Sequence, residues 1–252
     1  MTAAAVWLGS WVRGDAASDD LLEATARAFP DAPAVVSLRG ARQAPVPEVL
    51  RAIRVTGADG TWLLLPRPGA TVGWPADAPG APVPAVLLSR GDLGLGLLRH
   101  EASGWLWDPA GSAVLAPVQA QMLTARSGAR ALAGAVTTAA ERLERLGLDR
   151  AATASSPRTW ELALGRLPVG LDPQVEALLI RLGALHDALD LALRDDGAAV
   201  TAGEARARAA EVRAVVGQVQ DVIVGVIGGL NAPAPVVGEL RARARGGADL
   251  GR

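Results

Sequence analysis

Two histidines are the side chains in this sequence best suited to general acid–base chemistry near neutral pH. His100 precedes Glu101, and His186 precedes Asp187 and lies four residues before Asp190. A catalytic histidine needs a proton acceptor within hydrogen-bond reach. Sequence neighbours point to opposite faces of a strand and lie about 100° apart on a helix, so neither adjacent pair is preassembled. We therefore predict no catalytic residue at either position.

Metal and cofactor chemistry is not indicated either. His186, Asp187 and Asp190 could supply ligands, but the chain contains no HExxH or His-x-x-x-His spacing. The absence of cysteine removes thiolate ligands, thiol nucleophiles and disulfides together. The glycine-rich stretch at 91–96 leads into strand-like residues and lacks the lysine of a phosphate-binding loop. We predict no metal and no cofactor.

One long loop carries the residues that could contact a ligand or a partner. Residues 66–85 are crowded with proline and glycine, and a loop of this length is usually a lid, a binding loop or a linker. Trp74 and Arg67 lie in it, and tryptophan and arginine are both common in interface cores. With His100, they are our candidate contact residues. The alternative is that Trp74 folds back and anchors the loop.

Composition and charge exclude several classes of function. Half of the residues are hydrophobic and the formal net charge is −1, which suits a globular chain with no general attraction to nucleic acid or anionic membranes. The apolar run at 222–230 is far shorter than the ~20 residues of a membrane-spanning helix. No basic segment precedes the apolar start of the chain, so we expect no signal peptide and a cytoplasmic protein.

The first half of the chain predicts a small sheet with helices packed on it. The alternating order of strands and helices is typical of a small α/β layer. We expect strands at 3–12, 34–38 and 61–65, helices at 21–29 and 48–55, and a three-stranded antiparallel continuation over 86–89, 93–101 and 104–108.

The second half predicts long helices with matching apolar stripes. In a helix over 118–146 the apolar residues alternate at steps of four and three, which is the heptad pattern of a helix that packs against other helices. These residues are Val118, Met122, Ala125, Ala129, Leu132, Val136, Ala139, Leu143 and Leu146. Two further stripes run over 175–192 and 212–230, and a short helix is expected at 156–164.

Details of the 118–146 helix can be predicted as well. Gly128 and Gly134 lie within it, so we expect a kink or a close helix crossing there. Glu141 and Arg145 are spaced to form a solvated ion pair.

The N-terminal part also resembles a known family. Its segment DDLLEATARAF is followed by PEVLRAIRVTGADGTWLLLPRPGATVGWP, in which a small helix leads to a strand ending in a Pro-x-Pro-Gly loop. Over roughly residues 1–90, this order resembles a family of uncharacterised proteins from high-G+C bacteria. That family carries no assigned activity, so the resemblance implies no catalytic residue.

These observations predict a two-part α+β protein. We expect a small α/β sheet domain at 1–110, an antiparallel three-helix bundle at 111–232 and a flexible tail at 233–252. The first functional hypothesis is a non-enzymatic interaction or scaffold protein, whose bundle drives self-association or binds a protein partner. The alternative is a small-molecule-binding sensor or enzyme with its site under the 66–85 loop.

Overall fold

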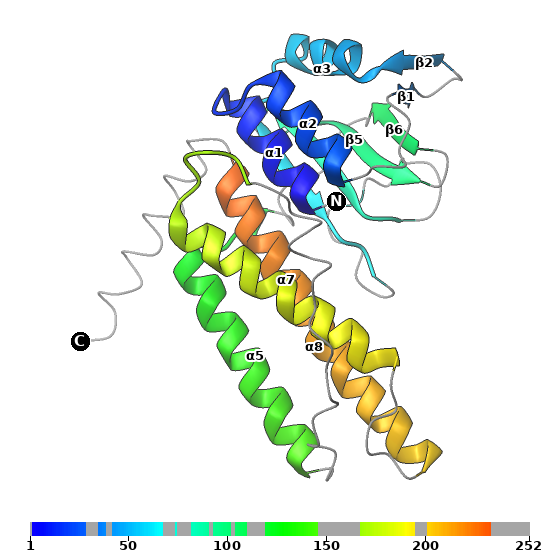
Figure 1. Cartoon of the computed structure of the whole chain (residues 1–252), viewed down its shortest axis with the longest axis vertical. Coiled ribbons are helices and arrows are strands. Elements are labelled where there is room, and N and C mark those ends of the chain that lie inside the picture. Colours follow the sequence, from blue (N-terminus) through cyan, green and yellow to red (C-terminus); the bar gives the residue numbers. More distant parts are fainter. Residues whose placement is uncertain are drawn as a thin grey trace, which may run out of the picture. The chain divides into compact units, whose positions relative to one another are not determined.

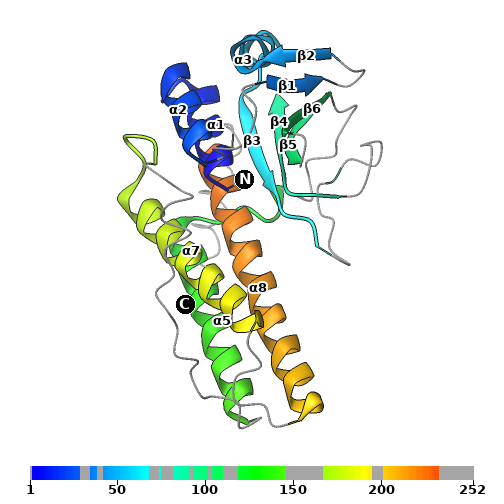
Figure 2. The same ribbon diagram turned by 45° about the vertical axis from the view of Figure 1, so that its right-hand side comes forward.

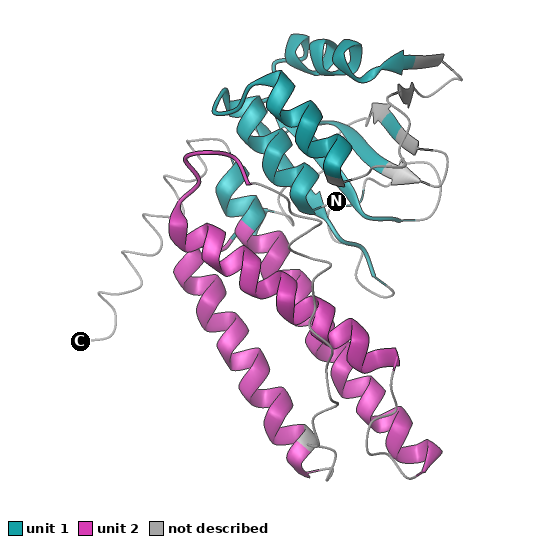
Figure 3. Cartoon of the chain, in the orientation of Figure 1, with its two compact units in different colours: residues 1–122, 227–252 teal, residues 123–226 magenta. Residues whose placement is uncertain are grey.

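The computed structural model describes residues 2–28, 35–38, 42–67, 74, 82–90, 93–101, 104–109, 119–145, 167–194 and 201–232. The chain forms two compact units (Figure 3). The sheet unit comprises residues 1–122 and 227–252, and the helical unit comprises residues 123–226. The predicted α+β class, with a sheet part followed by helices, is confirmed. The domain boundaries at 110 and 232 stay predictions, and the compact sheet unit also takes in residues 227–232.

A six-stranded sheet organises the sheet unit (Figure 1). Its strands are β1 (Val35–Leu38), β2 (Arg42–Pro45), β3 (Gly60–Leu64), β4 (Ala85–Arg90), β5 (Leu93–Glu101) and β6 (Gly104–Pro109). They lie in the order β2-β1-β6-β5-β4-β3, and only the β1–β6 pair is parallel. The predicted antiparallel run of β4, β5 and β6 is confirmed. The sequence did not predict β2, a polar edge strand in which a proline is tolerated.

The expected first strand at 3–12 is wrong, because this segment is the helix α1 (Thr2–Arg13). Every residue from Thr2 to Trp11 is buried. A segment that is apolar on all sides shows no hydrophobic periodicity. The sequence pattern alone therefore cannot distinguish a buried helix from a buried strand. The three consecutive alanines at its start, which favour helix, were the better signal.

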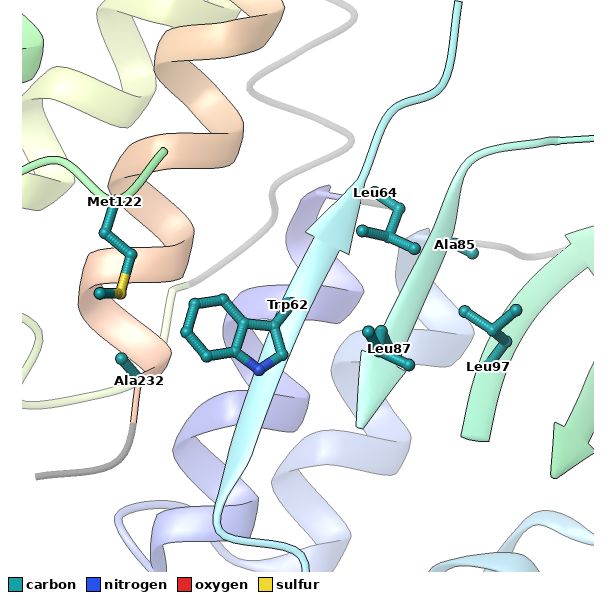
Figure 4. Packing of buried hydrophobic residues seen from close by; sticks show 7 residues of the cluster. All are labelled: Trp62, Leu64, Ala85, Leu87, Leu97, Met122 and Ala232. Carbon is teal, nitrogen blue, oxygen red and sulfur yellow. The ribbon is translucent and has the colours of Figure 1, made fainter. Parts of the chain in front are cut away.

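The two faces of the sheet are covered differently. Helices α1, α2 (Ser18–Ala28) and α3 (Val46–Val55) cover one face of the sheet (Figure 2). Leu98 of β5 points to this face, because it lines a pocket together with residues of all three helices. The opposite face carries an apolar cluster (Figure 4). Met122 and Ala232, which lie just before and just after the helical unit in the sequence, belong to it. Its members are Trp62, Leu64, Ala85, Leu87, Leu97, Met122 and Ala232.

The helical unit contains α5 (Ala125–Arg145), α7 (Pro173–Arg194) and most of α8 (Ala202–Asn231). Gly128, near the start of α5, lies against Leu178 of α7 and Val226 of α8. Arg142, near the end of α5, pairs with Glu211 in the first half of α8. Thus α8 runs antiparallel to α5, whereas α5 and α7 run in the same direction (Figures 1 and 2).

The parallel α5–α7 pair differs from the all-antiparallel bundle that the sequence predicts. Antiparallel neighbours follow only from short connections. The chain between α5 and α7 covers residues 146–172, long enough to span the roughly 30 Å of a 21-residue helix. The short helix predicted at 156–164 falls among the residues that the structure does not describe.

The start of α5 also differs from the prediction. The helix begins at Ala125 rather than near residue 118, because Thr124 and Ser127 form a reciprocal cap. The Thr124 backbone N–H donates to Ser127 Oγ at 2.9 Å, and the Ser127 N–H donates to Thr124 Oγ1 at 3.2 Å. This is the capping-box arrangement with serine in place of the usual glutamate.

Candidate functional site

The structure places the loop residue Trp74 against the sheet rather than in open solvent. Trp74 is partly buried and packs on the apolar cluster that contains Trp62, the arrangement expected of a loop anchor. Arg67, three residues after the end of β3, is half-buried. The backbone of His100 pairs with Trp105 across β5 and β6, but the His100 side chain is not described. A common ligand site for Arg67, Trp74 and His100 therefore stays a prediction.

The second histidine, His186, lies on α7. Among the residues that the structure describes, no group of three histidine, cysteine or carboxylate side chains is placed to hold a metal ion. The carboxylate of Asp190, four residues after His186, forms an ion pair with Arg194. The ion pair of Asp190 is thus formed within its own helix.

An apolar pocket lies between the sheet and the helices that cover it. It has a cavity volume of about 40 Å³. Its one polar side chain, Thr25, donates its hydroxyl hydrogen to the Leu21 carbonyl at 2.7 Å. The pocket therefore suits an apolar group and offers no catalytic chemistry. Its lining residues are Ala4, Leu8, Leu21, Thr25, Val46, Val49, Leu50, Ile53 and Leu98.

This pocket lies on the face of the sheet opposite to the described loop residue Trp74. Leu98 lines the pocket, whereas its neighbour Leu97 belongs to the cluster on which Trp74 packs. Adjacent residues of a strand point to opposite faces, so the pocket and Trp74 lie on opposite faces of the sheet. No described residue of the loop lines it.

A buried polar clamp holds α1 against the end of α8. Asn231, the single asparagine of the chain, is fully buried. Its Nδ2 donates to the Ala5 carbonyl at 2.9 Å, and its Oδ1 accepts from Arg13 at 3.0 Å. The Asn231 side-chain amide fits here because residue 9 is glycine, since a Cβ at that position would lie 2.5 Å from Nδ2. The sequence carried one signal for this clamp, a lone asparagine at the end of an apolar run.

The helix α5 is apolar on more of its surface than the bundle covers. The side turned toward α7 and α8 includes Gly128 and Ala139, which are buried. Ala129 and Val136 belong to the predicted heptad pattern, yet both are exposed, and Val136 keeps 41% of its surface accessible. Exposed alanines flank them. We call the resulting strip the outer face of α5, and it consists of Ala129, Ala133, Val136 and Ala140.

Charged side chains border this outer face on one flank. Arg126 and Arg130 lie in the first half of α5, and Glu141 and Glu144 lie near its end. None of these four charged groups forms an ion pair with any described residue. The predicted Glu141–Arg145 ion pair is not formed, because Arg145 Nε donates to the backbone carbonyl of Glu141 at 3.2 Å.

The two glycines of α5 behave differently. Gly128 sits at a close helix crossing, as expected, since a Cβ there would lie 2.7 Å from Val226 Cγ2. Gly134 has no neighbouring atom within 4 Å of such a Cβ. The predicted close approach is therefore confirmed at one glycine and not at the other.

The helix α8 is long and apolar enough to cross a membrane by length and composition. However, 56% of its most apolar window is buried inside the protein, and the core helices of globular proteins meet the same criterion. The expectations of no membrane and a cytoplasmic location stay predictions.

The described residues define an α+β protein with a small apolar pocket in its sheet unit and an uncovered apolar helix face in its helical unit. Residues 1–98 match the family model described as Rv1486c-like protein, N-terminal domain. The match confirms the resemblance to an uncharacterised family seen in the sequence, and it covers the chain from α1 into β5. Neither a curated protein nor a solved structure matched the chain.

Proposed function

We propose that this chain is a non-enzymatic interaction protein whose helical unit associates through the outer face of α5. The observation that supports the proposal is the exposure of Val136 and its alanine neighbours on a helix whose adjacent side, with Gly128 and Ala139, is packed. A helix of a self-contained bundle normally turns polar residues to water. Here the uncovered strip is apolar over three turns.

The free energy gained by burying the outer face determines how strong the association can be. Full burial of a valine contributes about 1.5–3 kcal/mol, so covering the exposed part of Val136 contributes roughly 1 kcal/mol. Alanines add less each. Association through this face is therefore weak to moderate and depends on the flanking charges as well as on apolar contact.

Light scattering across a concentration series, with a pull-down against lysate of the source cells, tests the proposal. The Ala133→Glu variant places a charge on the outer face, whereas Ala131→Glu makes the same change at an exposed position outside that face. We expect the first variant to lose assembly or partner retention and the second to keep it. A strictly monomeric wild-type protein that retains no partner at high concentration would rule out the proposal.

A second candidate function, favoured by the pocket, is binding of a small apolar ligand in the sheet unit. This keeps the ligand-binding alternative but moves its site from the 66–85 loop to the face covered by α1, α2 and α3. Leu98→Trp should fill the pocket and lower the binding of an apolar fluorescent probe, measured by titration. Equal probe binding by wild type and variant would remove this candidate.

A further inference from the structure

We propose that the partner of the outer face is the same face of a second copy of this chain, with the two α5 helices packed antiparallel. This inference rests on the proposed function and specifies its partner. It comes from two features of α5, the spacing of its exposed apolar residues and the placement of four charges that form no ion pair with a described residue.

The exposed apolar residues of α5 are arranged symmetrically along the helix. Ala129 and Ala140 have the same midpoint as Ala133 and Val136, between residues 134 and 135. In an antiparallel pair, Ala129 therefore lies level with Ala140 of the second copy, and Ala133 lies level with its Val136. Such a contact is self-complementary, as a two-fold dimer requires. The three alanines allow the helix axes to approach to about 8 Å.

The charges on the adjacent flank follow nearly the same symmetry, since Arg126 and Glu144 are centred on residue 135 and Arg130 and Glu141 between residues 135 and 136. With 3.6 residues per turn, Arg126, Arg130, Glu141 and Glu144 fall within about 60° of one another around the helix. They lie directly beside the outer face, with the arginines toward one end and the glutamates toward the other.

Antiparallel packing brings this flank of one helix against the same flank of the other with its ends reversed. Arg126 then faces Glu144 of the second copy, and Arg130 faces its Glu141, which gives four ion pairs in the dimer. In a parallel pair the charged flanks of the two copies would lie on opposite sides of the contact, so these charges would not meet one another. Since none of these groups forms an ion pair with a described residue of its own chain, the second copy supplies their partners.

The exposed strip on α7 is a poorer dimer surface. Ile180 and Leu191 are 39% and 37% exposed there, but Asp187 lies between them on the same side of the helix. A dimer formed through this strip would have to take the charged Asp187 side chain out of water, which is costly. The outer face of α5 contains no charged residue, so it is the face that a second copy covers.

Charge reversal tests the pairing on the full-length chain, with sedimentation equilibrium at low salt as the measurement. In the Glu144→Arg dimer, Arg126 of each copy faces an arginine of the other, so that positive charges repel at both ends. In the Arg126→Glu dimer, Glu144 of each copy faces a glutamate, so that negative charges repel at both ends. We expect each variant alone to raise the dimer Kd by about tenfold or more. Mixed in equal amounts, the two variants should form a heterodimer with near wild-type affinity. Arg213→Glu, an exposed change on α8, is the control and should leave the Kd unchanged.

Cross-linking gives an independent measurement, because the natural chain contains no cysteine. An oxidised mixture of Ala133→Cys and Val136→Cys variants should form a disulfide-linked dimer, whereas Ala131→Cys should not. These two positions are level in the antiparallel pair and would be separated in a dimer formed through another surface.

The outcomes separate this inference from the proposed function. The antiparallel pairing is overturned if the chain self-associates with a Kd that neither charge reversal changes and no 133–136 cross-link forms. A monomer that binds a different protein through the outer face also overturns it but leaves the proposed function standing. A strict monomer without any partner refutes both.

Discussion

Replacing Gly9 by alanine tests the buried clamp between α1 and α8. In the middle of a helix, this change normally stabilises by about 0.8–1 kcal/mol, because glycine is the poorer helix former. At Gly9 the added Cβ would lie 2.5 Å from Nδ2 of Asn231. The amide cannot turn away at low cost, because it is fully buried and is bonded to the Ala5 carbonyl and to Arg13.

The magnitude follows from the contacts that must be given up. Displacing the amide disrupts a hydrogen bond to the charged Arg13, worth about 1.5–3 kcal/mol, and leaves the Ala5 carbonyl short of a donor. Subtracting the gain in helix propensity, we expect Gly9→Ala to lower the free energy of unfolding by about 1–3 kcal/mol. Gly134→Ala is the matched control. Its Cβ would meet no atom within 4 Å, so it should raise stability by about 0.5–1 kcal/mol.

Denaturant unfolding followed by tryptophan fluorescence is the assay. Trp7 and Trp11 lie on α1 on either side of Gly9 and are 7% and 3% exposed, so they report directly on the packing of that helix. In an Asn231→Ala background, Gly9→Ala should cost much less, which gives a coupling energy well above 0.5 kcal/mol in a double-mutant cycle. If Gly9→Ala stabilises the protein as Gly134→Ala does, the clamp reasoning is refuted.

Three further substitutions probe the packing of both units. Gly128→Ala should destabilise the helical unit, because its Cβ would lie 2.7 Å from Val226 Cγ2 and overpacking costs about 1–3 kcal/mol; an unchanged or raised melting temperature by circular dichroism would contradict this. Thr201→Ala removes the acceptor for a backbone N–H at the start of α8 and should cost about 1 kcal/mol, measured by urea unfolding. Trp62→Phe removes the 2.9 Å bond from Nε1 to Ser89 Oγ in the sheet core and should cost about 1–3 kcal/mol, whereas a midpoint equal to that of wild type would show that the buried hydroxyl finds another partner.

Local chemistry in the sequence predicted the helices α7 and α8 well. The Asp172 carboxylate accepts the Gln174 N–H at 2.7 Å, and Thr201 and Glu204 form the expected reciprocal cap with both bonds at 3.1 Å. Caps of this kind involve residues only two or three apart, so the sequence alone contains both partners. The same applies to the central strands, whose apolar runs end at turn residues.

Features that depend on distant partners were not predictable in the same way. The clamp at Asn231 joins atoms more than 200 residues apart in the chain, and no local pattern marks such a pair. The direction of α7 relative to α5 depends on how the long connection between them runs. Trp74 could be proposed either as a ligand contact or as a loop anchor, and only the position of the sheet cluster shows which neighbours it has.

The heptad pattern of α5 shows why a correct pattern can still mispredict a surface. A straight α-helix drifts by about 20° per heptad relative to a strict seven-residue repeat, so a seam of this length turns gradually around the helix. The apolar positions of α5, from Ala135 round to Ala133, therefore cover about 160°, more than the roughly 100° that one packed side uses. The bundle covers one part of this arc and leaves Val136 exposed in the other. The period predicts that α5 packs against helices, but it is the width of the apolar arc that indicates a second contact, and the charges beside it indicate a second copy of the same helix.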